Sequence, residues 1–395
     1  MSTDPGSAGV VIVGSGIAGI TAAETLRSLG YTGPVTVIGD EPHLPYRRTA
    51  LSKDLCGADL SHDKIRLRKP EFWDERDIAI VTGTTVEHID ADGRGVVCAD
   101  GRRFDYDALV LATGGRPRSV AAVDAAVPTL RRHDEAVELQ RALDGKPVVI
   151  VGGGLIGLEI AASAAATAES VTVLEAAPAV LTRVLPDDVA TAIADLHRAN
   201  GVDIVTGVDV ASATPDTVTT ADGVHTGTVI AAIGMTPDTG LAESVGAAVG
   251  PAGIVVDDEL RTDVAGVYAA GDVAARPHPI TGEPSRAEQW MTATEHGKLV
   301  ATTIAADLGL DTSAAAPVPR IPLAWTIQHG KNIQLVGWPG SADRTEVDGD
   351  IDAFDATVRC FQGDTLIGAV CLGRAAAGRA LRTEIDEAIG SKVGT

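Results

Sequence analysis

One glycine pattern occurs twice in this chain, and it constrains the fold more than any other feature of the sequence. Residues 10–21 read V-V-I-V-G-S-G-I-A-G-I-T and residues 148–159 read V-V-I-V-G-G-G-L-I-G-L-E. The glycines of the two copies lie 138 positions apart, at Gly14, Gly16 and Gly19 and at Gly152, Gly154 and Gly157. An apolar strand, a G-x-G-x-x-G turn and a helix, in that order, predict two nucleotide-binding units in an α/β chain.

An acidic residue follows each turn at the distance where a ribose contact is expected. Asp40 comes 21 residues after the last glycine of the first copy, with Glu41 next to it, and Glu175 comes 18 residues after the second copy. In such a turn the backbone approaches a pyrophosphate, the helix N-terminus attracts its charge, and the acid accepts the ribose hydroxyls. Two alanines follow Glu175, so no arginine is at hand for a 2′-phosphate. The second turn therefore favours NADH over NADPH.

The length and charge of the chain limit its class. At 395 residues it exceeds what one hydrophobic core usually supports, so two or three domains are expected. The net charge of -22 disfavours nucleic acid and anionic membranes as partners of the whole protein. The opening residues M-S-T-D-P-G-S-A-G lack a signal segment, and the apolar runs are strand-sized, which predicts a cytoplasmic protein.

The four cysteines form no close pair in the sequence. Cys56, Cys98, Cys360 and Cys371 are far apart, so neither a metal site nor a dithiol redox centre is expected. Cys56 lies nearest the first glycine turn. It is either a single redox-active thiol or a small inert cysteine, and the second is the commoner case.

Later strands of the chain repeat as well. Residues 109–117, L-V-L-A-T-G-G-R-P, align with residues 229–237, V-I-A-A-I-G-M-T-P, and each run ends in a glycine turn. A third such run, V-Y-A-A-G-D-V at residues 267–273, adds the acid Asp272. This carboxylate would either cap a helix or accept a ribityl hydroxyl of a flavin.

Taken together, these stretches resemble a known family. G-S-G-I-A-G, L-P-Y-R-R-T-A-L-S-K, A-T-G-G-R-P-R, G-G-G-L-I-G-L-E and Y-A-A-G-D-V-A are similar to stretches of the FAD-dependent, NADH-using ferredoxin reductases. That family serves bacterial cytochrome P450 and aromatic-ring dioxygenase systems, and it is related to rubredoxin reductases and apoptosis-inducing factor. The likeness continues through A-E-Q-W-M-T-A-T-E-H-G-K and A-W-T-I-Q, so it covers nearly the whole chain.

The resemblance implies a domain order and a reaction. An FAD domain split between residues 1–114 and 242–317 would surround an NAD domain at 115–241, and a C-terminal α/β domain at 318–395 would close the flavin site. Both nucleotide domains would be Rossmann-like, as in glutathione reductase. Hydride would pass from NADH C4 to flavin N5, and single electrons would then pass to a [2Fe-2S] ferredoxin. Monomer and homodimer both stay open.

The resemblance also implies which residues hold the cofactors, and it includes no metal ligands. The residues expected to hold FAD are Gly14, Gly16, Ala18, Gly19, Asp40, Glu41, Arg48, Lys53, Ala112, Thr113, Gly114, Gly271, Asp272, Trp290 and Trp325. The residues expected to hold NAD are Gly152, Gly154, Leu155, Ile156, Gly157, Glu175 and Gly234.

Lys53 and Glu159 are the catalytic residues that the resemblance implies. Lys53 would lie beside the flavin and pair with Glu159 across the domain boundary, because a cation near the ring stabilises negative charge on the reduced flavin. Alternatively, both are ordinary surface residues of helices. Trp290 and Trp325 would flank the flavin or belong to the core. His197 is expected to end a helix without a catalytic role.

The chain departs from the family pattern at two places near the expected flavin edge. The usual R-P-P-L-S-K reads R-T-A-L-S-K here, with Thr49 and Ala50, and the usual W-S-D-Q reads W-T-I-Q, with Ile327. These changes leave the electron acceptor open. It is a ferredoxin or a small molecule such as a quinone, a nitro compound or oxygen, unless the chain is a nucleotide-sensing interaction protein.

An acidic ferredoxin would need a local basic patch on this acidic chain. The candidate residues are one run, Lys64, Arg66, Arg68 and Lys69, and one set of loop residues, Arg47, Arg48, Arg116 and Arg118. Each is either a docking surface or a plain solvated face.

Overall fold

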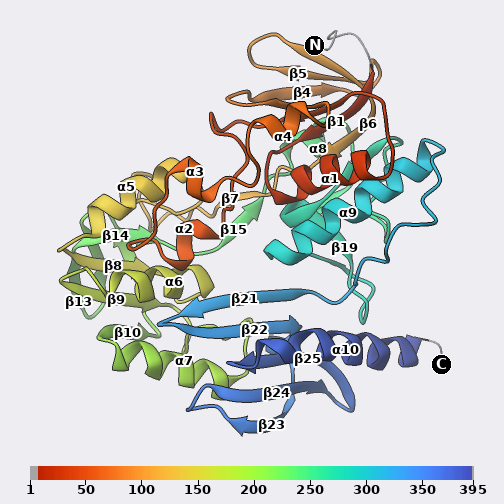
Figure 1. Ribbon diagram of the computed structural model, residues 1–395. Helices are drawn as coiled ribbons and strands as arrows, with labels where there is room; N and C mark the ends of the chain where they lie inside the picture. Colours follow the sequence, from red (N-terminus) through yellow and green to blue (C-terminus); the bar gives the residue numbers. More distant parts are fainter. Residues whose placement is uncertain (1–7, 394–395) are drawn as a thin grey trace. The chain divides into compact units, whose positions relative to one another are not determined.

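The structure is a computed structural model that describes residues 8–393 (Figure 1). The opening stretch used above to predict a cytoplasmic location, and the outer ends of the first and last predicted domains, lie outside the described residues. The chain forms two compact units. The first comprises the chain up to residue 47 with residues 62–116 and 237–320, and the second comprises residues 48–61, 117–236 and the chain from residue 321 onward. The domain boundaries given above remain predictions.

The first unit is built on a seven-stranded sheet. Its path runs β3-β2-β1-β6-β5-β4, and β18 also pairs with β6. The parallel strands are β1 (Gly9–Val13), β2 (Val35–Ile38), β3 (Ile78–Val81), β6 (Arg103–Leu111) and β18 (Val267–Ala269). The antiparallel strands are β4 (Val86–Asp90) and β5 (Gly95–Cys98). All five residues of β1 are buried, as expected for a parallel strand covered on both faces.

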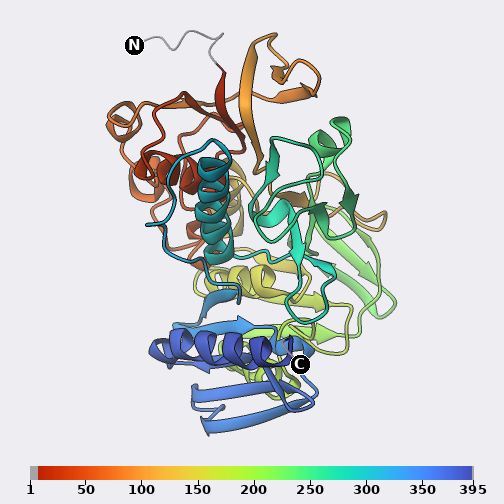
Figure 2. The ribbon, with the colours of Figure 1, turned by 90° about the vertical axis from the view of Figure 1, so that its right-hand side faces the viewer.

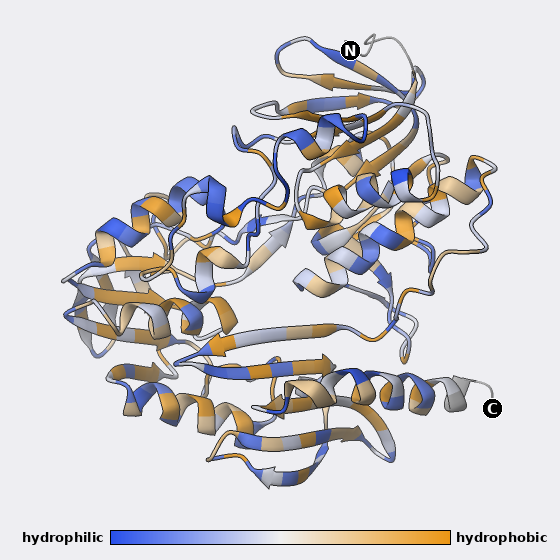
Figure 3. Ribbon diagram, in the orientation of Figure 1, coloured by the Kyte–Doolittle hydropathy of each residue, from blue (hydrophilic) through white to orange (hydrophobic). Residues whose placement is uncertain are grey.

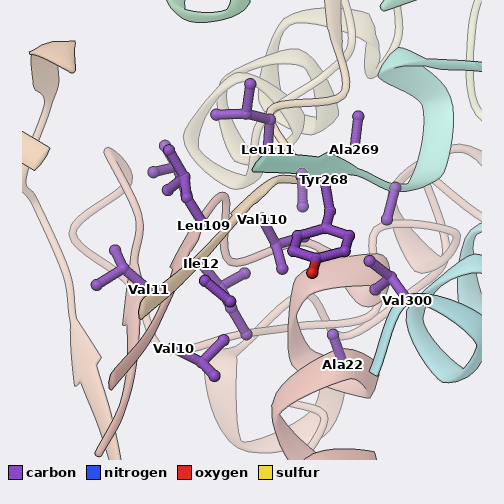
Figure 4. Packing of buried hydrophobic residues seen from close by; sticks show 14 of the residues in the cluster. Val10, Val11, Ile12, Ala22, Leu109, Val110, Leu111, Tyr268, Ala269 and Val300 are labelled. Carbon is purple, nitrogen blue, oxygen red and sulfur yellow. The ribbon is translucent and has the colours of Figure 1, made fainter. Parts of the chain in front are cut away.

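Two helices of the first unit pack closely on each other, α1 (Ile17–Ser28) and α9 (Trp290–Asp307). Gly297 permits the approach, because a Cβ there would lie 2.5 Å from the carbonyl oxygen of Ala18. Figure 4 shows the core between these helices and the sheet, where Ile12, Val110 and Val300 pack around Tyr268. The glycine turn after β1 therefore lies beside a buried hydrophobic core.

Smaller elements complete the first unit. They are α3 (His62–Ile65), α4 (Glu71–Asp74), α8 (Gly240–Ser244), the 3-10 turn η1 (Gly271–Val273), and the sheet of β16 (Val249–Gly250), β17 (Gly253–Val255), β19 (Ala274–Pro277) and β20 (Pro284–Ser285). The chain passes between the units in β7 (Gly115–Pro117) and β15 (Met235–Pro237).

The second unit repeats the strand-turn-helix design on a parallel sheet of order β10-β9-β8-β14. Its strands are β8 (Pro147–Val151), β9 (Ser170–Glu175), β10 (Val202–Thr206) and β14 (Thr228–Ala231). The helices are α2 (Ala50–Lys53), α5 (His133–Leu143), α6 (Leu155–Ala164) and α7 (Asp187–Ala199). A small antiparallel sheet adds β11 (Val210–Ala213), β12 (Thr217–Thr220) and β13 (Gly223–Thr226).

The C-terminal part of the second unit is an antiparallel sheet of order β21-β22-β25-β24-β23. Its strands are β21 (Leu323–Gln328), β22 (Lys331–Gly337), β23 (Arg344–Asp350), β24 (Asp355–Gln362) and β25 (Thr365–Leu372), with the short turns η2 (Pro339–Ser341) and η3 (Ala375–Ala377). The last helix, α10 (Gly378–Val393), packs along β25 and β22 (Figure 2). The edge strand β23 is polar and mostly exposed (Figure 3), which protects the sheet edge from pairing with other chains.

The predicted α/β fold class is confirmed, with a mixed, largely parallel sheet in the first unit, a parallel sheet in the second, and a C-terminal antiparallel sheet with a helix. None of the described helices combines the length and the hydropathy that crossing a membrane requires. The predicted cytoplasmic location stays a prediction.

Candidate functional site

The first glycine turn, after β1, is dictated by close backbone contacts. Gly14 has φ +113° and donates its N–H to the Ile38 carbonyl at 2.8 Å, and a Cβ on it would lie 2.1 Å from the Ala112 carbonyl oxygen. A Cβ on Gly19 would lie 2.1 Å from the carbonyl oxygen of Gly14. Any other residue at either position would collide with backbone, so the structure explains both glycines without a ligand.

The second turn, after β8, has the same geometry. Gly152 has φ +111° and donates to the Leu174 carbonyl at 2.8 Å, and a Cβ on it would lie 2.4 Å from the Ala232 carbonyl oxygen. A Cβ on Gly157 would lie 2.1 Å from the Gly152 carbonyl oxygen. The repeated sequence therefore produces a repeated structure, one copy in each unit.

The middle glycines, Gly16 and Gly154, are different because no nearby protein atom would collide with a side chain at either position. A Cβ on either residue would have nothing within 4 Å. Each is the N-cap of its helix, α1 or α6, and no side chain makes a cap hydrogen bond there. Open space beside free N–H groups at a helix N-terminus is what a pyrophosphate requires. Both turns therefore fit a dinucleotide.

The acid of the second turn is held directly against that turn. Glu175 ends β9, and its carboxylate accepts the Gly153 N–H at 2.7 Å and the Ala177 N–H at 2.8 Å. A carboxylate oxygen has a second lone pair, so ribose hydroxyls can still donate to it. The other predicted NAD residues lie around the same turn: Leu155 and Ile156 open α6, and Gly234, with φ +100°, follows β14.

The first turn has its acids at a different place. At the end of β2, where the second unit has Glu175, the chain has Gly39, and a Cβ there would lie 2.4 Å from the Ser15 hydroxyl oxygen. Asp40 follows and is exposed, whereas Glu41 is buried and accepts the Tyr46 hydroxyl at 2.7 Å. Glu41 thus has a partner inside the protein, and Asp40 is the acid that remains accessible to solvent.

A third strand-to-glycine turn packs against the first one within the same unit. Gly271 has φ +78°, and a Cβ there would lie 2.8 Å from the Cβ of Ala18 in α1. Its N–H donates to Nδ1 of the buried His296 at 3.3 Å. Desolvation, and then the charge of Arg276, lower the pKa of His296 to about 4, which keeps the ring a neutral acceptor.

The remaining predicted flavin residues are placed as follows. Asp272 lies inside η1 and is half-buried, and the N-cap of that turn is Ala270, so the capping alternative for Asp272 is wrong. Trp290 is the first residue of α9 and is half-buried. Thr113 donates its hydroxyl to the Asp238 carbonyl at 2.7 Å, next to Gly114, whose φ is +68°.

The second unit contains a buried carboxylate that meets three donors. Glu159 lies on α6, one helical turn beyond the glycine turn, with 4% of its side chain exposed. One carboxylate oxygen accepts Lys53 Nζ at 2.7 Å and the Thr326 hydroxyl at 2.7 Å. The Ser52 hydroxyl donates to the other oxygen. These bonds satisfy a charge that burial would otherwise make costly.

Lys53 is enclosed as well, because 17% of its side chain is exposed. Its Nζ also donates to the Trp325 carbonyl at 2.9 Å and lies 5.2 Å from the centroid of the Trp325 ring. The surface alternative for Lys53 and Glu159 is therefore wrong. The structure brings Lys53, Glu159 and Trp325 together within one compact unit.

Several polar residues of this unit were missed by the sequence interpretation. Ser52 and Thr326 bind Glu159, and Gln328 binds Thr326 at 3.2 Å. His197, expected to end a helix without a catalytic role, is buried and contacts Gln328 at 2.8 Å. The sequence contained one signal for these contacts, the polar residues Thr326 and Gln328 at alternate positions of one strand. The structure shows that both side chains are buried.

Other predicted residues have local partners. Arg48 Nη1 donates to the Arg131 carbonyl at 2.5 Å, and Ala50 opens α2 directly after Thr49. Ile327 is 37% exposed on β21. Burial raises the pKa of the Cys56 thiol, whereas an activated cysteine needs a lowered pKa.

The chain is similar in sequence and fold to known proteins. A model of the pyridine nucleotide-disulphide oxidoreductase family matches residues 8–297, and a reductase C-terminal model matches residues 323–392. Rhodocoxin reductase of Rhodococcus erythropolis is 33% identical over 370 residues, covering 91% of this chain and 85% of the relative. The ferredoxin reductase component of chlorobenzene dioxygenase from Cupriavidus sp. is 36% identical over 338 residues, with coverage of 83% and 80%. The covalent putidaredoxin reductase-putidaredoxin complex matches with a TM-score of 0.88 and 32% identity, over 96% of this chain and 93% of that chain.

Proposed function

The chain belongs to the pyridine nucleotide-disulphide oxidoreductase family, and from this premise we propose that it carries electrons from NADH through FAD to a [2Fe-2S] ferredoxin. The family resemblance drawn from the sequence is confirmed, and the protein is an oxidoreductase that uses a flavin and a nicotinamide nucleotide. The observation that carries the proposal is the pair of glycine turns, one in each unit, with the same steric geometry and the same open middle glycine. NADH, the hydride donor, and FAD, the acceptor, would each need one such turn to bind a pyrophosphate.

FAD is the flavin that suits the first unit. Its turn at Gly14, Gly16 and Gly19 is of the type that receives a pyrophosphate, and FMN has no pyrophosphate. Ala18 and Gly271 are in close approach, so the third turn lies next to the first helix turn. We assign the exposed Asp40 to the adenosine ribose and Asp272 to the ribityl chain.

NADH is the nucleotide that suits the second unit. The Glu175 carboxylate is fixed by two backbone N–H groups beside the turn. A 2′-phosphate would meet this negative charge without a compensating arginine, since Ala176 and Ala177 follow. Repulsion between two anions in a partly desolvated site therefore disfavours NADPH.

The buried pair of Lys53 and Glu159 suits the nicotinamide end of this second site. A bound flavin supplies the chemistry, because it accepts a hydride and releases electrons one at a time. The protein's task is to position the two reactants and exclude water. Glu159 lies one turn beyond the phosphate-binding end of α6, and Lys53 neutralises its charge. We assign the pair to orienting the nicotinamide for transfer.

A ferredoxin is the acceptor that the relatives support, since one is named a ferredoxin reductase component and one solved structure joins a reductase to putidaredoxin. The basic run at residues 64–69 is a candidate docking surface. Arg66 and Arg68 in it pair with Asp63 and Glu24 at 2.7 and 2.9 Å. Among residues 8–393, Lys64 and Lys69 make no ion pair, so their charge is available to an acidic partner.

Steady-state turnover with NADH tests the proposal against its alternatives. Rates are measured with a [2Fe-2S] ferredoxin, with a quinone and with oxygen alone. We expect the ferredoxin rate to exceed both others and to fall with rising ionic strength, because the docking charges are screened. Turnover that is equal with oxygen alone would exclude the ferredoxin role, and a faster quinone reaction would favour a small-molecule reductase.

A further inference from the structure

Glu159 is one end of a chain of hydrogen bonds that extends through the interior of the second unit. The Thr326 hydroxyl contacts Glu159 at 2.7 Å, and the Gln328 amide contacts Thr326 at 3.2 Å. His197 Nε2 contacts Gln328 Oε1 at 2.8 Å, and His329 Nε2 contacts His197 Nδ1 at 3.1 Å. Thr326, Gln328 and His197 are all buried, so water cannot replace any of these partners.

The bonds in this chain have one direction. Lys53 and Ser52 both donate to the Glu159 carboxylate, which is therefore an acceptor from Thr326 as well. Because the Thr326 hydrogen points to Glu159, its oxygen accepts from the Gln328 NH₂ group. The Gln328 carbonyl then accepts the Nε2–H of His197.

The two histidines complete the chain with fixed tautomers. Burial lowers the pKa of His197 to about 4, so at neutral pH its ring has one donor and one acceptor. With the proton on Nε2, Nδ1 accepts from the Nε2–H of His329. His329 and Gly330 are the two residues between β21 and β22, with φ of +48° and +75°, as in a type I′ hairpin turn. The hairpin turn therefore fixes the position of His329, at the outer end of the hydrogen-bond chain.

The opposite direction fails at Glu159. If the Gln328 amide were turned over, its carbonyl would take the Thr326 hydrogen, and the Thr326 oxygen would then face the carboxylate with lone pairs only. A buried carboxylate would lose one of its three donors, and a buried charge that is left short of a donor is unfavourable. The charge of Glu159 thus determines the orientation of residues that do not touch it.

We infer that Gln328 and His197 are positioning residues, which hold the Thr326 hydroxyl as a donor to Glu159 and so keep its negative charge paired with Lys53. The Gln328 amide does not release a proton at ordinary pH, so the chain orients Glu159 and does not conduct protons to it. The inference rests on the proposed function only for what Glu159 does with the nucleotide. The bonds themselves are independent of that assignment.

The test measures the protonation of Glu159 directly, by its infrared carboxyl band, identified as the band that Glu159→Gln removes. The pH is lowered stepwise from neutral, and the pH at which this band appears is compared among the variants. Gln328→Met removes the donor to Thr326, and His197→Phe removes the donor to the Gln328 carbonyl. Neither substitution changes a residue that is hydrogen-bonded to Glu159. In both, we expect the proton dissociation constant of Glu159 to fall about tenfold relative to the wild type, so the band appears at higher pH.

Four variants serve as controls for this measurement. Thr326→Val should give at least the same shift, Thr326→Ser should restore the wild-type titration, and adding Gln328→Met to Thr326→Val should change nothing further. Thr228→Val removes a hydroxyl bond to the Ala142 carbonyl elsewhere in the unit and should leave the band unmoved.

The result that overturns the inference is a band that titrates at the same pH in the wild type, Gln328→Met and His197→Phe. If one of the two fails to fold, the other decides. The proposed function is judged separately by the rate at which NADH reduces the flavin in Glu159→Gln. A wild-type rate there would remove the role of Glu159 in transfer and leave the infrared result to decide the positioning chain.

Discussion

The two glycine turns share a backbone and differ in the side chains around it. At matching positions the first unit has Ser15, Thr21 and Gly39, and the second has Gly153, Glu159 and Glu175. The contacts that demand glycine are alike in both, because a Cβ on Gly14 or Gly152 would lie 2.1 or 2.4 Å from the carbonyl oxygen of Ala112 or Ala232, just after a later strand of the same sheet. The backbone that can receive a pyrophosphate is therefore alike in the two units. Of these matching positions, two have a carboxylate in the second unit and none has one in the first. We therefore propose that the residues beside each turn, and not its glycines, determine which nucleotide binds.

The largest effect should come from breaking one turn at a time. Gly14→Ala and Gly152→Ala each force a side chain to φ near +110° and against a backbone oxygen. The strain alone costs about 1–3 kcal/mol, and the collision adds to it. Gly14→Ala should lose flavin colour, whereas Gly152→Ala should stay yellow and lose reduction by NADH. Flavin absorbance and stopped-flow reduction measure the two losses, and identical defects in both variants would contradict separate sites.

A smaller effect is expected from Lys53→Met, which removes the positive partner of Glu159 beside the second turn. Without Lys53, the buried Glu159 has an uncompensated negative charge. We therefore expect the activation free energy of flavin reduction by NADH to rise by about 1–3 kcal/mol. Glu159→Gln is the matched variant, and the double variant should show effects that do not add. Wild-type reduction rates in Lys53→Met, at equal flavin content, would show that the pair is structural only.

The smallest effect concerns the choice between the two nicotinamide nucleotides. Glu175→Ala should weaken use of NADH and relax discrimination against NADPH by about tenfold, or about 1.4 kcal/mol, since a charged hydrogen bond and a repulsion are both lost. Glu175→Gln separates the two causes, because it keeps an acceptor for the Gly153 N–H and removes the charge. The ratio of kcat/KM for the two nucleotides is the measurement. A wild-type preference for NADPH would overturn the assignment of Glu175.

The sequence predicts the turns well because their cause is local. Gly14 and Gly19 are five residues apart, and the collision that fixes Gly19 involves Gly14 itself. Glu175 also acts within the same strand-turn-helix unit, because it is the last residue of β9 and accepts a hydrogen bond from Gly153 in the second turn. The fold class followed from these units because a strand, a turn and a helix of this kind have few other uses.

The buried chain behind Glu159 could not be predicted in the same way. His197 and Gln328 are 131 positions apart, and no period in the sequence joins a helix to a strand at that distance. Lys53 and Glu159 were paired only through the family resemblance, and the structure adds Ser52 and Thr326, which complete the carboxylate's partners. Long-range polar contacts depend on tertiary packing, for which single residues give no signal.

The central claim is that one turn holds the acceptor of hydride and the other its donor. Anaerobic titration of the purified protein with NADH tests it most directly, followed by denaturation and identification of the released flavin. We predict a yellow protein that one equivalent of NADH bleaches and that releases FAD. A protein that binds no FAD when it is supplied, releases FMN, or keeps its colour with excess NADH would contradict the account.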